Sequence, residues 1–193
     1  MRKATRSVLL LAMASVLVLA LSASGQDSSP TEALQAFGTV QKVLQHPRCQ
    51  NCHIPGDAPL QFDDGRVHAQ NVKRGSDGRG AAGLHCDTCH GTENLPASYG
   101  PHMPPGAHGW RLPTPQHRMV FIGLSGGELC RQLKNKAENG GRDLAALRHH
   151  LDDELVVWGW HPGVGRAPVD IPHDQFVAAF EQWAKAGAPC PAP

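Results

Sequence analysis

Two five-residue segments of the sequence combine cysteine and histidine at the same spacing. They are residues 49–53, CQNCH, and residues 86–90, CDTCH, which we call the first and the second pentad. Cys-x-x-Cys-His is the attachment signature of haem c, in which both cysteines form thioethers with the haem vinyl groups and the histidine ligates the iron. The pentads therefore predict two covalently bound haem c groups. The expected attachment residues are Cys49, Cys52, Cys86 and Cys89, and the expected iron ligands are His53 and His90.

A structural zinc site is the alternative for the four cysteines, because two Cys-x-x-Cys pairs also occur in zinc-binding modules. Zinc does not require a histidine directly after the second cysteine of each pair. Only 12 of the 193 residues are histidine, so both positions are rarely filled by chance. Structural zinc also suits reducing compartments, whereas the N-terminal residues described below indicate export. The sequence thus favours haem over zinc.

The second axial ligands must come from histidine or methionine if both irons are six-coordinate. Met119 begins the segment MVFIGLS, residues 119–125, which is followed by Glu128 and a predicted helix. This segment resembles the end of small class I cytochromes c, in which an axial methionine precedes an aromatic residue, a Gly-Leu turn and a capped C-terminal helix. The resemblance implies that Met119, 29 residues beyond His90, ligates the second haem.

For the first haem we expect His68, 15 residues beyond His53, because a short loop can fold back over the opposite face of the ring. His150 is the main alternative for either iron, since it lies at the edge of the apolar face of a predicted helix. His102 and Met103 are further alternatives. Hydrogen-bond donors for the haem propionates could come from Arg74, Arg79, Arg111 and Trp110.

The elements that must position these residues are short helices joined by long loops. Apolar periodicity and capping signals predict helices over residues 30–44, 125–135, 143–158 and 173–186. Residues 54–118 are rich in glycine and proline and show little periodicity. The pentads begin only 37 residues apart, which leaves no room between them for a complete haem pocket. We therefore expect a mostly α fold: one compact dihaem cytochrome c domain, residues 26–193, with long loops wrapped on two haems.

The first 25 residues predict an exported protein. Arg2, Lys3 and Arg6 precede an uncharged apolar run over residues 7–21, and small residues follow, so we expect a cleaved signal peptide over residues 1–25. The run is short for a membrane span, and an uncleaved N-terminal anchor is the alternative. Because haem c is attached after export in bacteria, the expected compartment is the periplasm.

The remaining composition narrows the partners and suggests a cross-link. A net charge of +1 gives no strong field for nucleic acid or an anionic membrane, and no second apolar stretch predicts stable membrane insertion. Cys130 and Cys190 lie outside the pentads, and an even leftover pair in an exported chain predicts a disulfide. Such a bond closes a loop of about 60 residues and contributes about 3–4 kcal/mol.

The whole pattern resembles the exported dihaem c-type cytochromes of proteobacteria. More narrowly, it is similar to a family of small dihaem proteins in which the pentads are followed by LCRQLK, NGGR and WGW, here at residues 129–134, 139–142 and 158–160. Some of these proteins carry names that link them to isoquinoline 1-oxidoreductase, a molybdenum hydroxylase.

Two haems held close together in an exported domain make an electron relay. The expected function is therefore electron transfer from a dehydrogenase or other oxidoreductase to a downstream cytochrome or oxidase, with no catalytic residue. The alternative is a dihaem enzyme or sensor of the peroxidase kind. That alternative needs an iron with an open distal position and an acid–base group beside it.

Overall fold

The computed structural model describes residues 29–192, and the regular structure of this part is mainly helical. Its α-helices are α1 (Pro30–Leu44), α2 (Pro47–Gln50), α3 (Gly126–Lys134), α4 (Leu144–His150), α5 (Glu154–Val157) and α6 (His173–Lys185). Two antiparallel hairpins pair β1 (Leu60–Gln61) with β2 (Arg66–Val67) and β3 (Gly80–Ala81) with β4 (Leu84–His85). Short 3-10 helices are η1 (Ala69–Asn71), η2 (Cys86–Thr88), η3 (Ala97–Tyr99) and η4 (Trp158–Trp160). The fold is mostly α, as the sequence predicts.

Helix α1 begins where the sequence signals place it. Ser29 is the N-cap, and its side chain and that of Glu32 each bond the other residue's backbone N–H in a capping box. Pro30 takes the first helical position, where the missing N–H of proline costs nothing. Phe37 and Val40 lie on the buried face of the helix. Helix α1 therefore packs along this face and delivers the chain to the first pentad.

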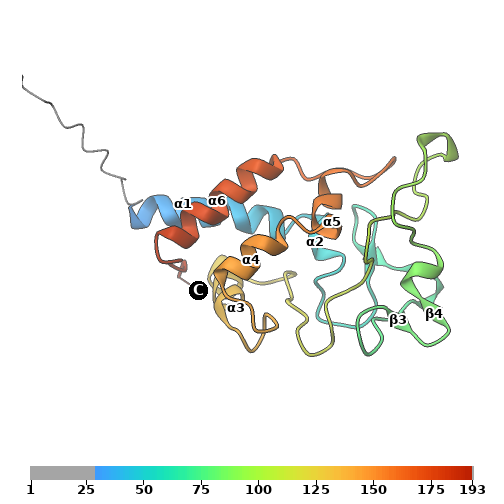
Figure 1. Cartoon of the computed structure of the whole chain (residues 1–193), viewed down its shortest axis with the longest axis horizontal. Coiled ribbons are helices and arrows are strands. Elements are labelled where there is room, and N and C mark those ends of the chain that lie inside the picture. Colours follow the sequence, from blue (N-terminus) through green and yellow to red (C-terminus); the bar gives the residue numbers. More distant parts are fainter. Residues whose placement is uncertain (1–28, 193) are drawn as a thin grey trace, which may run out of the picture.

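The hydrophobic core lies in the helical half of the molecule, where α1 and α6 pack side by side (Figure 1). Phe176, Phe180 and Trp183 of α6 are buried, and the Trp183 ring lies 5.0 Å from the ring of Phe37 between centroids. The Trp183 indole Nε1 donates a hydrogen bond to the Pro189 carbonyl at 2.9 Å, so burying this polar group leaves it satisfied. The last predicted helix is thus confirmed, with its aromatic residues inward.

The predicted disulfide joins α3 to the C-terminal tail. Cys130 and Cys190 are bonded, with Cα atoms 5.4 Å apart, and they lie 60 positions apart in the sequence. The Lys134 ammonium donates to the Ala188 carbonyl at 2.7 Å, which adds a polar contact between the same two segments. The tail is therefore held against α3 by a covalent and a hydrogen-bonded link.

The single helix expected over residues 143–158 is broken in two. Asp143 caps α4 as predicted, by accepting a hydrogen bond from the Ala146 N–H. Helix α4 nevertheless ends at His150, and α5 begins after Asp153. The reason is the pair of aspartates at 152 and 153, because aspartate favours caps and turns over helix interiors. The break leaves His150 at the C-terminal end of α4.

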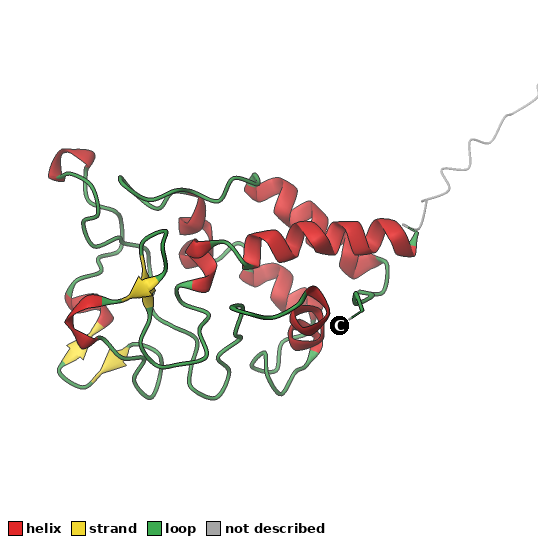
Figure 2. Ribbon diagram, turned by 180° about the vertical axis from the view of Figure 1, so that it is seen from behind, coloured by secondary structure: helices red, strands yellow, loops and turns green. Residues whose placement is uncertain are grey.

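Residues 54–118 form the other half of the molecule and carry all the strands of the described chain (Figure 2). This half is loop-rich, as predicted, and a buried arginine holds its loops together. The Arg74 guanidinium, fully buried, donates hydrogen bonds to the carbonyls of Pro113, Ile54 and Gly56. Three chain segments are thereby fixed to one another where few apolar side chains are available.

The predicted signal peptide, residues 1–25, lies outside the described residues, so its presence stays a prediction. Between residues 29 and 192, no helix has both the length and the apolar character that a membrane span needs.

Candidate functional site

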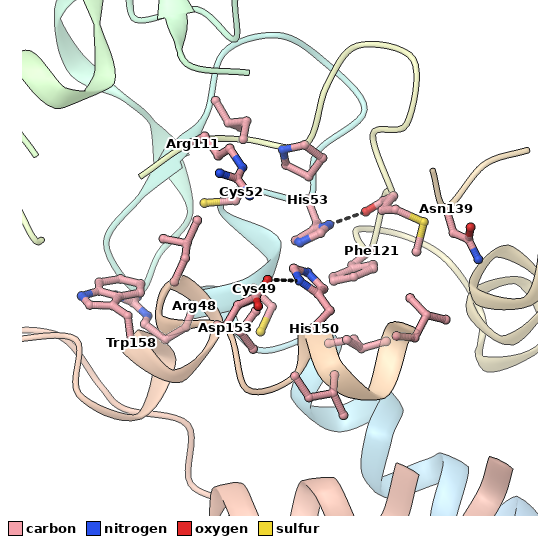
Figure 3. Close-up of a pocket in the computed structure, with 18 of the residues that line it drawn as sticks. Arg48, Cys49, Cys52, His53, Arg111, Phe121, Asn139, His150, Asp153 and Trp158 are labelled. Carbon is pink, nitrogen blue, oxygen red and sulfur yellow. Dashed lines mark hydrogen bonds and ion pairs between the residues drawn. The ribbon is translucent and has the colours of Figure 1, made fainter. Parts of the chain in front are cut away.

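The first pentad forms a short helical turn at the end of α2. His46 is the N-cap of this helix, and its Nδ1 accepts a hydrogen bond from the Arg48 N–H at 3.2 Å. The turn continues past α2, because the N–H groups of Cys52 and His53 both donate to the carbonyl of Cys49, at 3.2 and 3.1 Å. As a result, Cys49, Cys52 and His53 line one cavity (Figure 3).

This cavity lies between the first pentad and the helical core and has a volume of about 810 Å³. Cofactor pockets typically fall in the range of about 300–1,000 Å³ and are lined mainly by apolar side chains. Helices α1, α4 and α6 supply such a lining. The apolar residues that they contribute include Val40, Val43, Leu44, Leu147, Phe176 and Phe180. Size and chemistry therefore fit a porphyrin attached to the cysteines of the first pentad.

The His53 imidazole is held by a hydrogen bond and by a stacked aromatic ring. Its Nδ1 donates to the Met119 carbonyl at 2.8 Å, and its ring stacks on Phe121 with centroids 3.9 Å apart and planes within 9°. The Phe121 N–H in turn donates to the His53 carbonyl at 3.0 Å. The pKa of His53 is lowered to about 4, mainly by burial, and nearby His150 contributes to the same shift. The ring is therefore neutral at pH 7 with Nε2 available for a metal, the arrangement that metal-ligating histidines usually show.

A second imidazole lies in the same cavity. His150, at the end of α4, lines the cavity below His53 (Figure 3). Its Nδ1 donates to the Asp153 carboxylate at 2.6 Å, which again leaves Nε2 available. The break between α4 and α5 brings His150 and Asp153 together. Four histidines line the cavity of the first pentad, His53, His108, His117 and His150, and of these His53 and His150 bond a partner through Nδ1.

The second pentad repeats this pattern on a 3-10 turn. The His90 N–H donates to the Cys86 carbonyl at 3.0 Å, and the His90 Nδ1 donates to the Pro105 carbonyl at 2.7 Å. The ring stacks on Trp110 with centroids 4.3 Å apart and planes within 6°. Burial lowers the pKa of His90 to about 4, and the Pro105 hydrogen bond opposes that shift. Cys86 is buried and Cys89 exposed, so this site lies closer to the surface than the first.

His68 lies beside His90, with ring centroids 6.1 Å apart and planes at 61°. Its Nδ1 donates to the Ala69 carbonyl at 2.8 Å, so its Nε2 is available as well. If a metal ion bound one nitrogen of each imidazole, at the roughly 2 Å usual for such bonds, the two ring centroids would be about 6 Å apart. The separation of the two rings therefore fits an iron between them.

The cysteines of the first pentad are held as neutral sulfur. Burial raises the pKa of Cys49 to about 12 and that of Cys52 to about 11. Zinc binds thiolates, whereas thioethers carry no charge. Within residues 29–192, moreover, no three or more His, Cys, Asp or Glu side chains converge on a point where a metal ion could sit. A haem iron needs no such group, because the porphyrin supplies four of its six ligands.

The two pentads lie close to each other. The Cys86 sulfur is near enough to Cys52 to contribute to the raised pKa of that thiol. Trp110, which stacks on His90, also lines the cavity of the first pentad and meets Trp158 edge-on at 4.9 Å between centroids. One indole therefore touches both sites.

The structure pairs Met119 and His68 with the pentads in the reverse of the expected order. Met119 lies beside His53, to which its carbonyl is bonded, and His68 lies beside His90. The β1–β2 hairpin explains the position of His68. The His68 N–H donates to the Pro59 carbonyl at 2.9 Å, so the chain turns away from its own pentad and reaches the next one.

Other predicted residues take structural contacts. The His102 ring meets Phe62 edge-on at 4.9 Å, and the Met103 carbonyl accepts a hydrogen bond from Arg166 at 2.6 Å. Of the four proposed propionate donors, Trp110 and Arg111 line the cavity. Arg74 bonds loop carbonyls instead, and Arg79 is exposed.

The groups that orient the imidazoles were not among the residues predicted from the sequence. Asp153 could have been found from its position three residues after His150 on a predicted helix, where side chains meet. The stacking of Phe121 on His53 and of Trp110 on His90 has no local signal. The same holds for the Pro105 carbonyl, 15 residues from its partner.

No protein-family model, no curated protein and no solved structure matches this chain. The resemblance to dihaem cytochromes therefore rests on the pentads and on the segments quoted with them.

Proposed function

We propose that this protein is a periplasmic dihaem c-type cytochrome that transfers electrons. One observation carries the proposal: each pentad histidine is accompanied by a second histidine, and all four bond through Nδ1 and leave Nε2 available. Bound haem supplies reversible one-electron chemistry at its iron. The residues of this chain attach it, ligate it and shield it from water.

The proposed ligands are His53 and His150 for the first haem, and His90 and His68 for the second. With two histidines for each iron, no position would remain open for a substrate such as peroxide. This arrangement favours an electron carrier over the enzyme or sensor alternative. Bis-histidine ligation also gives a lower reduction potential than histidine–methionine ligation, so we expect potentials below those of class I cytochromes c.

The short separation of the pentads supports a relay between two partners. Cys86 is near enough to Cys52 to contribute to its raised pKa, and Trp110 touches both sites. The buried first site and the more exposed second site make two different haem environments in one domain. The proposed partners are a dehydrogenase or other oxidoreductase as donor and a cytochrome or oxidase as acceptor.

The test is the haem content and the ligation of the exported protein. We expect an intact mass with two covalent haems and an oxidised spectrum in which both irons are low-spin. A mass with one haem or none contradicts the proposal, as does a high-spin iron that binds cyanide readily in the unaltered protein.

Ligand substitutions then assign the irons. His150→Ala and His68→Ala are each expected to convert one haem, and a different haem in each case, to a high-spin form. His149→Ala, at the exposed neighbour of His150, is the matched control and should leave both low-spin. Met119→Leu distinguishes between His150 and Met119 as the ligand, because this variant should leave the spectra of both haems unchanged if His150 is the ligand. Loss of a near-infrared sulfur-to-iron band in that variant contradicts our assignment.

A further inference from the structure

His150 differs from the other three candidate ligands in the group that its Nδ1 bonds. His53, His90 and His68 donate to neutral backbone carbonyls, at 2.7–2.8 Å. His150 donates to the Asp153 carboxylate, at 2.6 Å. A carboxylate acceptor carries a full negative charge, and hydrogen bonds to charged groups are shorter and stronger than those between neutral groups.

The position of Asp153 in the fold shows that its side chain is turned to this contact. Asp153 is the N-cap of α5, yet its side chain makes no capping hydrogen bond to that helix. An aspartate at this position usually bonds the N–H of the second or third helical residue, which stabilises the helix by about 1 kcal/mol. Here the carboxylate bonds the imidazole instead. The geometry at the α4–α5 break is thus organised around His150.

We propose that Asp153 is a positioning residue that lowers the reduction potential of the first haem through His150. The inference rests on the proposed ligation of that haem by His53 and His150. A carboxylate that accepts a hydrogen bond from Nδ1 makes the imidazole a stronger electron donor. Such an imidazole stabilises ferric iron more than ferrous iron. The second haem has no such partner, because the Nδ1 atoms of both His90 and His68 bond carbonyls.

The consequence is a built-in difference between two haems with the same ligand types. Three of the four imidazoles, those of His53, His68 and His90, donate to neutral carbonyls, and that of His150 donates to a carboxylate. Asp153 therefore contributes to the direction of electron flow, since electrons pass from the lower to the higher potential. Its removal should reduce this contribution without changing the ligands.

The experiment is a redox titration of the purified dihaem protein and of Asp153→Asn. Asparagine keeps the size of the side chain and its acceptor oxygen but removes the charge. We expect one of the two midpoint potentials to rise and the other to stay unchanged, while both haems remain low-spin. Asp152→Asn is the matched control, because it removes the same charge from the same turn and Asp152 bonds Arg148 rather than His150. The shift in Asp153→Asn should exceed that in the control.

Asp153→Ala adds a second measurement, because alanine also removes the acceptor. With the ring free to rotate, we expect the low-spin electron paramagnetic resonance signal of one haem to change in this variant and to be retained in Asp153→Asn. Equal shifts in Asp153→Asn and Asp152→Asn, or no shift in either, overturn the inference while the proposed function stands. If His150→Ala leaves both irons low-spin, the proposed ligation itself fails.

Discussion

Three of the four candidate iron ligands, His53, His68 and His90, are oriented by hydrogen bonds to backbone carbonyls, and His150 is oriented by a side chain. Met119 has a positive φ of 47°, an uncommon conformation for a residue other than glycine. Its carbonyl accepts a hydrogen bond from the His53 Nδ1. The Pro105 carbonyl does the same for His90. Each pentad ring also stacks on an aromatic side chain, Phe121 or Trp110. Contacts within the protein therefore orient the imidazoles of both pentads, His53 and His90.

Trp110 provides a test of this orientation at a single residue. The planes of His90 and His68 lie at 61°, and the low-spin ferric resonance signal of a bis-histidine haem depends on that angle. Trp110→Leu removes the stacked ring, so we expect the signal of the second haem to shift while the iron stays low-spin. Trp110→Phe, which can still stack, is the control and should show a smaller change. An unaltered signal in Trp110→Leu means that the Pro105 hydrogen bond alone fixes the ring.

Two turns determine the positions of His150 and His68. The interruption between α4 and α5 turns residues 150–153 into a corner, and the β1–β2 hairpin carries His68 to the second pentad. Both features are turns whose sequence signals are weaker than those of the helices around them. By contrast, α1, α3 and α6 are regular supports that pack together around the core. The α3 support is anchored by the disulfide from Cys130 to Cys190.

The disulfide is expected to stabilise the fold without affecting the haems. Cys130 is fully buried, so alanine is the suitable replacement because serine would bury a hydroxyl. We expect the double variant Cys130→Ala/Cys190→Ala to lose about 3–4 kcal/mol in the free energy of unfolding, chiefly because the unfolded chain gains freedom. Denaturant titration of the dihaem protein measures the loss. The visible spectrum should match that of the unaltered protein, and a changed spectrum would show that the tail supports the haem site directly.

The part of the chain that the structure describes, residues 29–192, is divided between a helical half that holds the hydrophobic core and a loop-rich half (Figures 1 and 2). The first cavity belongs to the helical half, because residues of the core, among them Val40 and Phe180, line it. The second pentad lies in the loop half, where Cys89 is exposed. A haem bound in the first cavity, as proposed, would therefore complete the core, and one bound at the second pentad would cover loops. The low aromatic content, 5%, fits a core of which a cofactor is a part.

This division predicts unequal effects of losing each haem. Cys49→Ala/Cys52→Ala removes attachment at the cavity, and Cys86→Ala/Cys89→Ala removes it at the surface site. We expect the first variant to be less stable than the second by about 2–5 kcal/mol, because an unfilled cavity in a core costs contacts that loops do not lose. Thermal or denaturant unfolding of the two single-haem proteins measures the difference. Equal stabilities would contradict the assignment of the first haem to the core.

The sequence by itself determined the local features of this protein. The pentads, the helix start at Ser29-Pro30, the capping box at Ser125, the last helix and the disulfide all follow from residues within a few positions of one another or from counting cysteines. Such signals are readable because the interactions behind them, a cap or a helical face, act over one or two turns. The mostly α class and the loop-rich segment 54–118 follow in the same way.

Only the tertiary structure decided which histidine faces which pentad. His150 lies 97 residues after His53, and no periodicity links positions so far apart. His68 follows the first pentad in sequence but lies beside the second, because a hairpin reverses the chain between them. The resemblance to class I cytochromes c predicts Met119 as a ligand of the second haem, whereas in the structure Met119 lies beside His53 of the first pentad, and its carbonyl accepts a hydrogen bond from the His53 Nδ1. Side-chain partners that meet through packing depend on the path of the whole chain, which local sequence does not encode.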